Sequence, residues 1–348
     1  MGPMPTKEQI TEILKTVQYP GFSRDIVSFG MVTGISVEDG RVQVGLTVTS
    51  GDDAVVAELR SRCERAITSL PGVRSAEIQV DHKRPEAPGA GFSKSELPGV
   101  KHIVAVASGK GGVGKSTVAA NLACAFRLEG LASGLCDCDI YGPSMGLMFG
   151  TNERPMATED EQIIPIERYG LKLMSMGFLA DPETPAILRG PMVTRYTQHF
   201  LRGVLWGDLD VLVLDLPPGT GDIQLTIVQT LALSGAVIVT TPQEVALIDA
   251  RKASGMFAKV NVPILGLIEN MSYFQCPTDN KRYFLFGEGG GRKEAKRLGV
   301  PLLAELPIDI AAREAGDAGR PIVIADPSNA VSRAFREAAQ AIRRRIEG

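Results

Sequence analysis

The chain has 348 residues, which at about 150 residues per domain is enough for roughly two domains. Charged residues make up 22% and hydrophobic residues 44%, and 37 Lys and Arg stand against 40 Asp and Glu. This balance is typical of a soluble globular protein, and we expect no nucleic-acid partner. No run approaches the roughly 20 apolar residues of a membrane span, and no signal pattern begins the chain, so we expect a cytoplasmic protein without a membrane partner.

The first 80 residues alternate between helical and strand-like patterns. Apolar residues recur at helical spacing from Ile10 to Val17 and alternate from Arg41 to Val48. The expected elements are a helix over residues 7–17, a strand over 41–48, a helix over 54–67 and a strand over 75–80. We therefore predict a small α+β domain over residues 5–81.

A second domain is expected after a linker. Residues 82–98 are rich in Pro and Gly and show no periodicity, which indicates a linker. After them, nearly continuous Val, Ile and Leu runs alternate with helical patterns, as in strands that are buried on both faces of a parallel sheet. Such runs cover residues 102–108, 211–216, 236–241 and 263–268. We predict a doubly wound α/β domain with a mostly parallel sheet over residues 99–348.

A phosphate-binding loop follows the first of these strands. Residues 109–117 (GKGGVGKST) fit the pattern G-x-x-x-x-G-K-[ST] between a strand and a helix. Glycines let backbone N–H groups converge on phosphates, Lys115 can reach the β and γ phosphates, and Ser116 can bind Mg²⁺. The predicted ATP-binding residues in this loop are Gly109, Lys110, Gly111, Gly112, Val113, Gly114, Lys115, Ser116 and Thr117. The alternative is a glycine-rich turn without a ligand.

Carboxylates that end buried strands are candidates for Mg²⁺ binding and catalysis. Asp215 ends the run 211–215, where a carboxylate can bind Mg²⁺ and sense the γ-phosphate. By its position relative to the loop, Asp139 is the candidate that orients the attacking water, with Asp137 as the alternative. Either residue could instead cap the following turn. Together with Ser116, Asp139 and Asp215 are the predicted Mg²⁺ ligands.

Several longer blocks resemble the Mrp/ApbC family of iron–sulfur cluster carrier ATPases. They are residues 139–144 (DIYGPS), 189–192 (RGPM), 215–225 (DLPPGTGDIQL), 240–243 (TTPQ) and 269–272 (ENMS). The first 80 residues are similar to the MIP18-like domain that precedes the ATPase domain in some members. The resemblance implies ATP hydrolysis, a homodimer, and delivery of a [4Fe–4S] cluster to apo iron–sulfur proteins. Because switch-like dimers commonly do not need rapid chemistry, we expect the hydrolysis to be slow.

The resemblance also implies roles for single residues. Lys110 marks the deviant Walker A group of MinD and ParA, in which this lysine reaches the partner's nucleotide across a dimer interface; the alternative is a solvated loop lysine. Asn270 would contact adenine, or else satisfy local backbone. The catalytic residues implied are Lys110, Lys115, Asp139 and Asp215.

The family's cysteines are only partly present. Members usually carry Cys-Pro-x-Cys after the ENMS block, whereas this chain reads Cys276-Pro-Thr-Asp279. Cys276 is therefore a candidate cluster ligand, with an ordinary loop cysteine as the alternative. The run 281–287 (KRYFLFG) resembles chloroplast-type members that lack the Cys pair. The small domain has Tyr19-Pro-Gly21 and Ser50-Gly-Asp-Asp-Ala54 where relatives have Asp-Pro-Glu and a Cys-Pro, so we expect no cluster there.

The other cysteines look structural. The chain has five, an odd number that does not suggest a disulfide framework, and we expect reduced thiols that pack as small hydrophobic residues. Cys136 and Cys138, two residues apart on a strand, would point to the same face.

Two other functions are compatible with the sequence. A ParA/MinD-type positioning ATPase would act on a membrane or protein partner, and the apolar stripe from Val331 to Ile346 next to basic residues 343–345 could serve it. The same stripe is also typical of a helix that docks on its own domain. A reductase similar to the nitrogenase iron protein is the other alternative, and the missing second cysteine counts against it.

Overall fold

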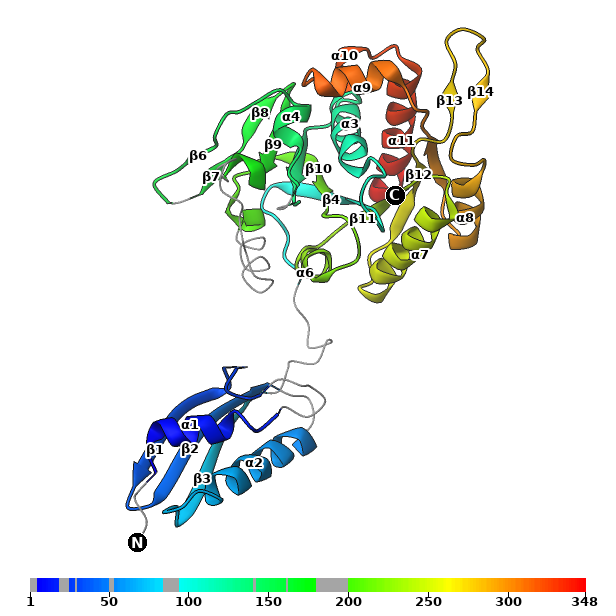
Figure 1. Ribbon diagram of the computed structural model, residues 1–348. Coiled ribbons are helices and arrows are strands. Elements are labelled where there is room, and N and C mark those ends of the chain that lie inside the picture. Colours follow the sequence, from blue (N-terminus) through cyan, green and yellow to red (C-terminus); the bar gives the residue numbers. More distant parts are fainter. Residues whose placement is uncertain are drawn as a thin grey trace. The chain divides into compact units, whose positions relative to one another are not determined.

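The computed structural model describes residues 5–18, 25–28, 30–49, 53–83, 94–139, 142–160, 162–179 and 200–348. The block at 189–192 and residues 19–21 and 50–52 lie outside these ranges. The chain divides into two compact units, Met1–Phe92 and Ser93–Gly348 (Figure 1). No helix in the described ranges is long and apolar enough to cross a membrane.

The N-terminal unit packs two helices on a three-stranded sheet. Its elements are α1 (Lys7–Leu14), β1 (Val32–Glu38), β2 (Arg41–Thr49), α2 (Asp53–Thr68) and β3 (Ser75–Lys83). Strand β2 lies in the centre, antiparallel to β1 and parallel to β3. The apolar positions that predicted α1 and β2, such as Leu14 and Val44, are fully buried in one core. A capping box between Thr6 and Gln9 begins α1.

Strand β1 was not anticipated from the sequence. It forms a hairpin with β2 in which Glu38 pairs with Arg41 across the two residues Asp39 and Gly40. Both have positive φ angles, 45° and 77°, and an Asp-Gly pair is a strong signal for such a turn. The signal was present, but partial exposure of β1 weakens its alternation of apolar and polar residues.

The C-terminal unit is built around an eight-stranded sheet in the order β15-β12-β11-β4-β10-β5-β9-β8. Every neighbouring pair is parallel except β8 and β9. The strands are β4 (Val100–Ala107), β5 (Ser133–Asp137), β8 (Ile166–Arg168), β9 (Leu171–Ser175), β10 (Leu209–Asp215), β11 (Gly235–Thr240), β12 (Ile264–Glu269) and β15 (Leu302–Glu305). Two short hairpins add β6 (Met156–Ala157) with β7 (Ile163–Ile164), and β13 (Phe274–Gln275) with β14 (Arg282–Tyr283).

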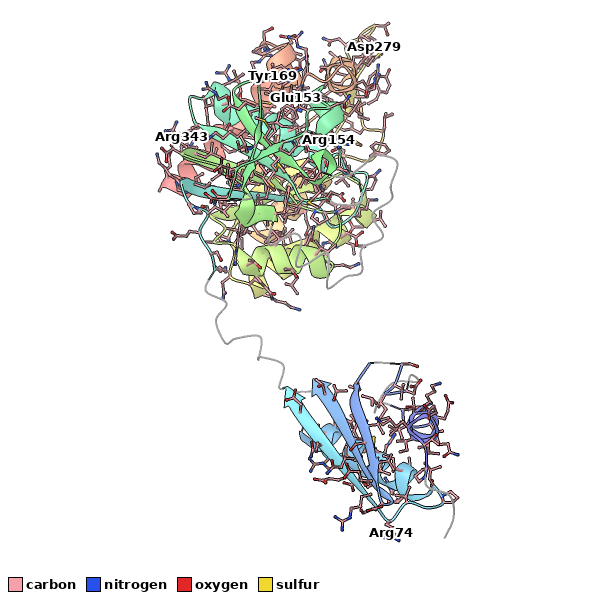
Figure 2. All side chains as sticks on the ribbon, turned by 90° about the vertical axis from the view of Figure 1, so that its left-hand side faces the viewer. Arg74, Glu153, Arg154, Tyr169, Asp279 and Arg343 are labelled. Atoms are coloured by element: carbon pink, nitrogen blue, oxygen red, sulfur yellow. The ribbon has the colours of Figure 1, made fainter. Side chains whose placement is uncertain are left out.

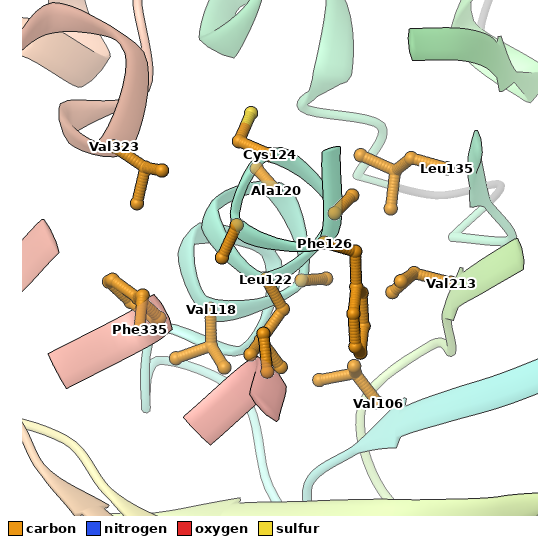
Figure 3. Close-up of a cluster of buried hydrophobic side chains, with 14 of the residues drawn as sticks. Val106, Val118, Ala120, Leu122, Cys124, Phe126, Leu135, Val213, Val323 and Phe335 are labelled. Atoms are coloured by element: carbon orange, nitrogen blue, oxygen red, sulfur yellow. The ribbon is translucent and has the colours of Figure 1, made fainter. Parts of the chain in front are cut away.

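Helices cover both faces of this sheet, with α3 and α11 on one side and α6 and α7 on the other (Figure 1). The helices are α3 (Lys115–Leu128), α4 (Met145–Met148), α6 (Asp222–Thr230), α7 (Glu244–Lys259), α8 (Gly290–Leu298), α9 (Ile310–Asp317), α10 (Ile322–Ala325) and α11 (Ala330–Glu347), with a 3-10 turn η1 (Met176–Phe178). Successive residues of the central strands enter opposite cores: on β10, Val213 packs under α3, and Leu214 packs under α6 and α7. Figure 3 shows Phe126 of α3 beside Val106 and Val213. Burial on both faces explains the continuous apolar runs and confirms the predicted fold class.

The strand order also places the predicted phosphate loop. The chain leaves β4 toward β5 and returns through β10, and then β11 lies on the other side of β4. Ligands of doubly wound sheets bind in the crevice at the carboxyl ends of strands where the order reverses in this way. The loop 108–114 follows β4 at this edge.

The C-terminal helix α11 docks on its own domain. Its stripe residues Val331, Phe335, Ala338 and Ile342 are buried in the core that also contains α3. A side chain that is buried in the core is not available to a membrane surface. The structure therefore removes the feature on which the membrane-positioning alternative rested.

We expect Phe335→Ala to destabilise the C-terminal unit by about 3 to 5 kcal/mol, because Phe335 is 2% exposed in a close-packed core. Phe284→Ala is the matched control: Phe284 is 40% exposed, and its loss should cost less than about 1 kcal/mol. Denaturant unfolding followed by the fluorescence of Trp206, the single tryptophan, reports on this unit alone. Equal midpoints for the two variants would contradict the packing of α11.

Candidate functional site

The loop between β4 and α3 has a shape that only glycines allow. Gly112 and Gly114 have φ angles of 80° and 79°, in the left-handed region. A Cβ on Gly109 would overlap the backbone of Asp249, and a Cβ on Gly114 would overlap the side-chain amide of Asn270. The loop is therefore held between α7 and the segment after β12. It ends at Lys115, the first residue of α3, so that the N–H groups of the first helical turn are available to an anion.

A buried ion pair joins this loop to β10. The ammonium of Lys115, 6% exposed, donates to Oδ1 of Asp215, which is fully buried. It also lies 3.3 Å from Oγ of Ser116. Burial raises the pKa of Asp215, while the charge of Lys115 and the hydroxyl of Ser116 oppose that rise. The other oxygen, Oδ2, has no hydrogen-bond partner in the described part of the chain, so it can accept a further ligand.

Asp137 is a structural carboxylate. It lies opposite Asp215 in the register of β5 and β10 and is fully buried. Its Oδ1 accepts from the Asp139 amide at 3.0 Å, and its Oδ2 accepts from the Ser144 amide at 3.2 Å and the Ser175 hydroxyl at 3.0 Å. Burial, followed by the nearby charge of Asp215, raises the pKa of Asp137 to about 7. These contacts match the alternative in which Asp137 caps the following turn.

Asp139 has a different environment. It is half-buried, and its Oδ1 accepts from the Gly142 amide at 3.1 Å. The residue lines a hollow of about 400 Å³ at the carboxyl edge of the sheet. The other lining residues are Gly142, Pro217, Pro218, Gly221, Ile223 and Gln224. Of the two candidate carboxylates, only Asp139 lines this hollow beside the segment that follows Asp215.

Asn270 and Lys110 lie at the same loop. The side-chain amide of Asn270, which follows β12, donates to the carbonyl oxygen of Val113 at 2.9 Å. This bond matches the alternative in which Asn270 satisfies backbone, and it places the residue beside the phosphate loop. Lys110 is half-buried, and its ammonium makes no hydrogen bond or ion pair to any residue that the structure describes.

Cys276 lies at the turn of the β13–β14 hairpin, which extends from the edge of the domain (Figure 1). Its backbone exchanges hydrogen bonds with Lys281 and Asn280, each of 2.9 Å, and its half-exposed Sγ lies 2.9 Å from Oγ1 of Thr278. Asp279, labelled in Figure 2, accepts from the Lys281 amide at 3.0 Å and the Tyr283 hydroxyl at 2.8 Å, and both bonds lower its pKa. The tip of the hairpin thus presents one thiol and one ionised carboxylate.

The other thiols are buried, as the sequence predicted. Burial raises the pKa of Cys63 to about 12 and raises the pKa of Cys124 and Cys136 as well. Cys136 and Cys138 lie with their sulfur atoms 4.0 Å apart inside the core. Among the described residues, no group of three or more His, Cys, Asp or Glu side chains is placed to hold a metal ion.

Glu269 is a residue whose role the sequence analysis missed. It is fully buried at the end of β12, where it accepts from the Ser272 hydroxyl at 2.5 Å and from the Gly291 amide at the start of α8. A Cβ on Gly291 would lie 2.8 Å from this carboxylate, which explains a glycine there. Glu269 therefore fixes the segment that carries Asn270 on one side and leads to the Cys276 hairpin on the other. The glycine run 289–291 was the available signal.

Comparison with known proteins identifies the families that the two units match. A ParA-class family described as NUBPL iron-transfer P-loop NTPase matches residues 99–343, and a family described as iron-sulfur cluster assembly protein matches residues 7–80. An iron-sulfur cluster carrier protein of Synechocystis sp. is 42% identical over 344 residues, 97% of each chain. One from Aquifex aeolicus is 51% identical over 258 residues, 74% of this chain and 71% of the relative. A nucleotide-binding protein of Archaeoglobus fulgidus, solved with ADP, superimposes with a TM-score of 0.59 at 37% identity and covers 68% of this chain and 92% of its own.

The raised pKa of Asp137 predicts a pH-dependent stability. Because its folded pKa of about 7 lies above the ordinary 3.8, the neutral group stabilises the fold at low pH, and this contribution is lost as the pH rises toward 7. The stability advantage of wild type over Asp137→Asn should therefore shrink between pH 4 and 7, by at most about 4 kcal/mol at roughly 1.4 kcal/mol per unit. Unfolding followed by Trp206 fluorescence measures this difference. Asp210→Asn is a control of opposite sign, because Lys101 and the Ala132 amide lower the pKa of Asp210.

Proposed function

The chain belongs to the family of NUBPL iron-transfer P-loop NTPases, and we propose that it binds and slowly hydrolyses ATP and carries an iron–sulfur cluster, as a homodimer, to apo iron–sulfur proteins. One observation carries the proposal. A single segment fixed by Glu269 supplies Asn270 to the phosphate loop and, six residues later, the half-exposed thiol of Cys276. The nucleotide site and the cluster ligand are therefore neighbours along the chain.

The phosphate loop holds the nucleotide in this proposal. The amides of residues 109–117 surround the β and γ phosphates, and Lys115, oriented by its ion pair with Asp215, contacts them. Asn270, which lies beside the loop, would also contact the base. Lys110, whose ammonium has no partner among the described side chains, would reach the nucleotide of a second copy.

The donors at this edge fit Mg²⁺, which prefers oxygen ligands. Oδ2 of Asp215 is buried without a hydrogen-bond partner among the described residues, and the Ser116 hydroxyl lies near the same carboxylate. We assign Ser116, Asp215 and Asp139 as the residues that would hold the ion directly or through water. When bound, Mg²⁺ would neutralise charge on the phosphates. Asp139, beside the hollow, orients the attacking water.

The hairpin binds the cluster in this proposal. Thiolates are the usual ligands of iron–sulfur clusters, and the hairpin offers one thiol and one carboxylate per chain. Because no described group of three ligands exists within one chain, a second copy is needed to complete four ligands. Two hairpins would supply Cys276 and Asp279 twice, which supports the proposal of a homodimeric carrier of a [4Fe–4S] cluster.

We expect Asp139→Asn to lower ATP turnover by about 100-fold or more, because the amide cannot accept a proton from water. Nucleotide affinity should change little, since the amide oxygen can still accept from Gly142. Phosphate release and nucleotide titration measure the two quantities separately. Asp317→Asn is the control, because its side chain is 63% exposed on α9. Wild-type turnover in Asp139→Asn would remove the residue from the mechanism.

We expect Cys276→Ser to lose most of the cluster that wild type takes up in anaerobic reconstitution with iron and sulfide, because a hydroxyl is a poor iron–sulfur ligand. Asp279→Asn should bind the cluster less stably. Thr278→Ala, next to the thiol, is the matched control and should retain the wild-type iron content. Iron analysis and visible absorbance measure the outcome. An unchanged iron content in Cys276→Ser would place the cluster elsewhere.

A further inference from the structure

A concentrated positive surface lies next to Cys276. Residues 279–297 contain six basic and three acidic side chains, a net charge of +3 in a chain whose total is −3. We call the six cations the basic platform; they are Lys281, Arg282, Arg292, Lys293, Lys296 and Arg297, and all are exposed on β14, α8 and the turn before β14. Arg292 pairs with Glu305 at 2.8 Å, and Arg282 stacks on the Tyr273 ring at 4.4 Å. The other four make no ion pair with any described residue.

Exposed apolar side chains lie within this platform. From Tyr283 to Phe286 four consecutive residues are 44%, 40%, 61% and 37% exposed. Two hollows adjoin them, one of about 480 Å³ lined by Phe286 and one of about 250 Å³ lined by Phe284. Both hollows share Glu288 and Lys293. Apolar residues rimmed by charges, next to hollows, are typical of a surface that binds another protein.

One oxygen of a buried carboxylate in the larger hollow also lacks a hydrogen-bond partner among the described residues. Glu294 is 2% exposed, and its Oε2 pairs with Arg251 at 2.7 Å. Its Oε1 has no hydrogen-bond partner in the described part of the chain. A buried acceptor without a partner is costly, and a backbone N–H of a docked segment would satisfy it.

Charge decides which partner fits. Two copies that met through α8, which carries four of the six cations, would bring like charges together, which is unfavourable; the proposed dimer instead shares the cluster at the hairpin tip. A lipid surface would also be opposed by Glu288 and by the carboxylate of Glu294, and it could not fill two separate hollows. A partner protein with an acidic segment and apolar side chains matches the cations, the exposed apolar strip and the hollows together.

We propose that the basic platform and the strip 283–286 form the docking surface for an acidic segment of the protein that receives the cluster. This inference rests on the proposed carrier function. Cluster transfer requires the acceptor's thiolates to approach Cys276 closely. The first residue of the platform, Lys281, follows Cys276 by five positions in the chain. An acidic acceptor would be steered to it by long-range attraction, which raises association rates and falls with salt.

The test neutralises three unpaired cations in the full-length protein: Lys293→Gln, Lys296→Gln and Arg297→Gln together. Gln preserves length and helix propensity, so α8 should form normally. The control neutralises three other exposed cations, Lys259→Gln, Arg344→Gln and Arg345→Gln, for the same change in net charge. The probe is the apo form of an acidic [4Fe–4S] ferredoxin. Its affinity for the cluster-free protein is measured by calorimetry, and transfer from the loaded protein is measured by circular dichroism.

We expect the platform variant to bind the apo-ferredoxin about tenfold more weakly than wild type at low salt and to lose most of its salt dependence, whereas the control variant behaves as wild type. Its cluster loading and ATP turnover should be unchanged. Equal affinities for the three proteins would overturn the proposal, as would loss of cluster loading in the platform variant alone. Binding of anionic phosphatidylglycerol vesicles in place of the ferredoxin would overturn it in favour of a membrane. Because the binding assay uses no cluster, failure of the carrier function would appear separately, as absent loading in wild type.

Discussion

The ion pair between Lys115 and Asp215 is the constraint around which the site is organised. Removing two charges from water costs several kcal/mol per ion, and the pair is tolerable only where its geometry is good and further polar partners are present. Here the parallel pairing of β4 and β10 brings the end of one strand next to the loop that leaves the other. The ion pair in turn holds the first helical turn of α3 at the carboxyl edge of the sheet. The parallel pairing of β10 with β5 places Asp137 opposite Asp215. Burial and the charge of Asp215 together raise the pKa of Asp137.

The segment after β12 connects the two functional regions. Asn270 donates to the phosphate loop, and Glu269 accepts from the Ser272 hydroxyl and from the Gly291 amide of α8. The amide of Ser272 donates to the carbonyl oxygen of Leu306, and the amide of Ile308 donates to that of Tyr273. These bonds tie the segment to the strand β15 side of the sheet and to α8. The segment between the phosphate loop and the hairpin is therefore held at both ends by hydrogen bonds to the rest of the domain.

The surface charge is unevenly distributed between the hairpin region and the rest of the chain. The chain is slightly acidic as a whole, while the region beside Cys276 is strongly basic. The positive charge of this region is complementary to an acidic partner. The amphipathic helix α11, whose sequence could have suggested a membrane surface, instead completes the core against α3.

The sequence by itself determined the parts that depend on local spacing. The glycine pattern of residues 109–117, the apolar runs of the parallel strands and the family blocks predicted the doubly wound fold, which the structure confirms, because each signal lies within a few consecutive residues. The tertiary structure alone decided what depends on sheet register and on contacts between distant segments. It distinguished the buried, fully bonded Asp137 from the accessible Asp139, paired Asn270 with Val113 across 157 residues, and showed that Glu269 supports α8. It also brought cations of the basic platform on α8 next to those of the β13–β14 hairpin. No local pattern encodes such contacts, because burial and partners are set only when the strands take their places in the sheet.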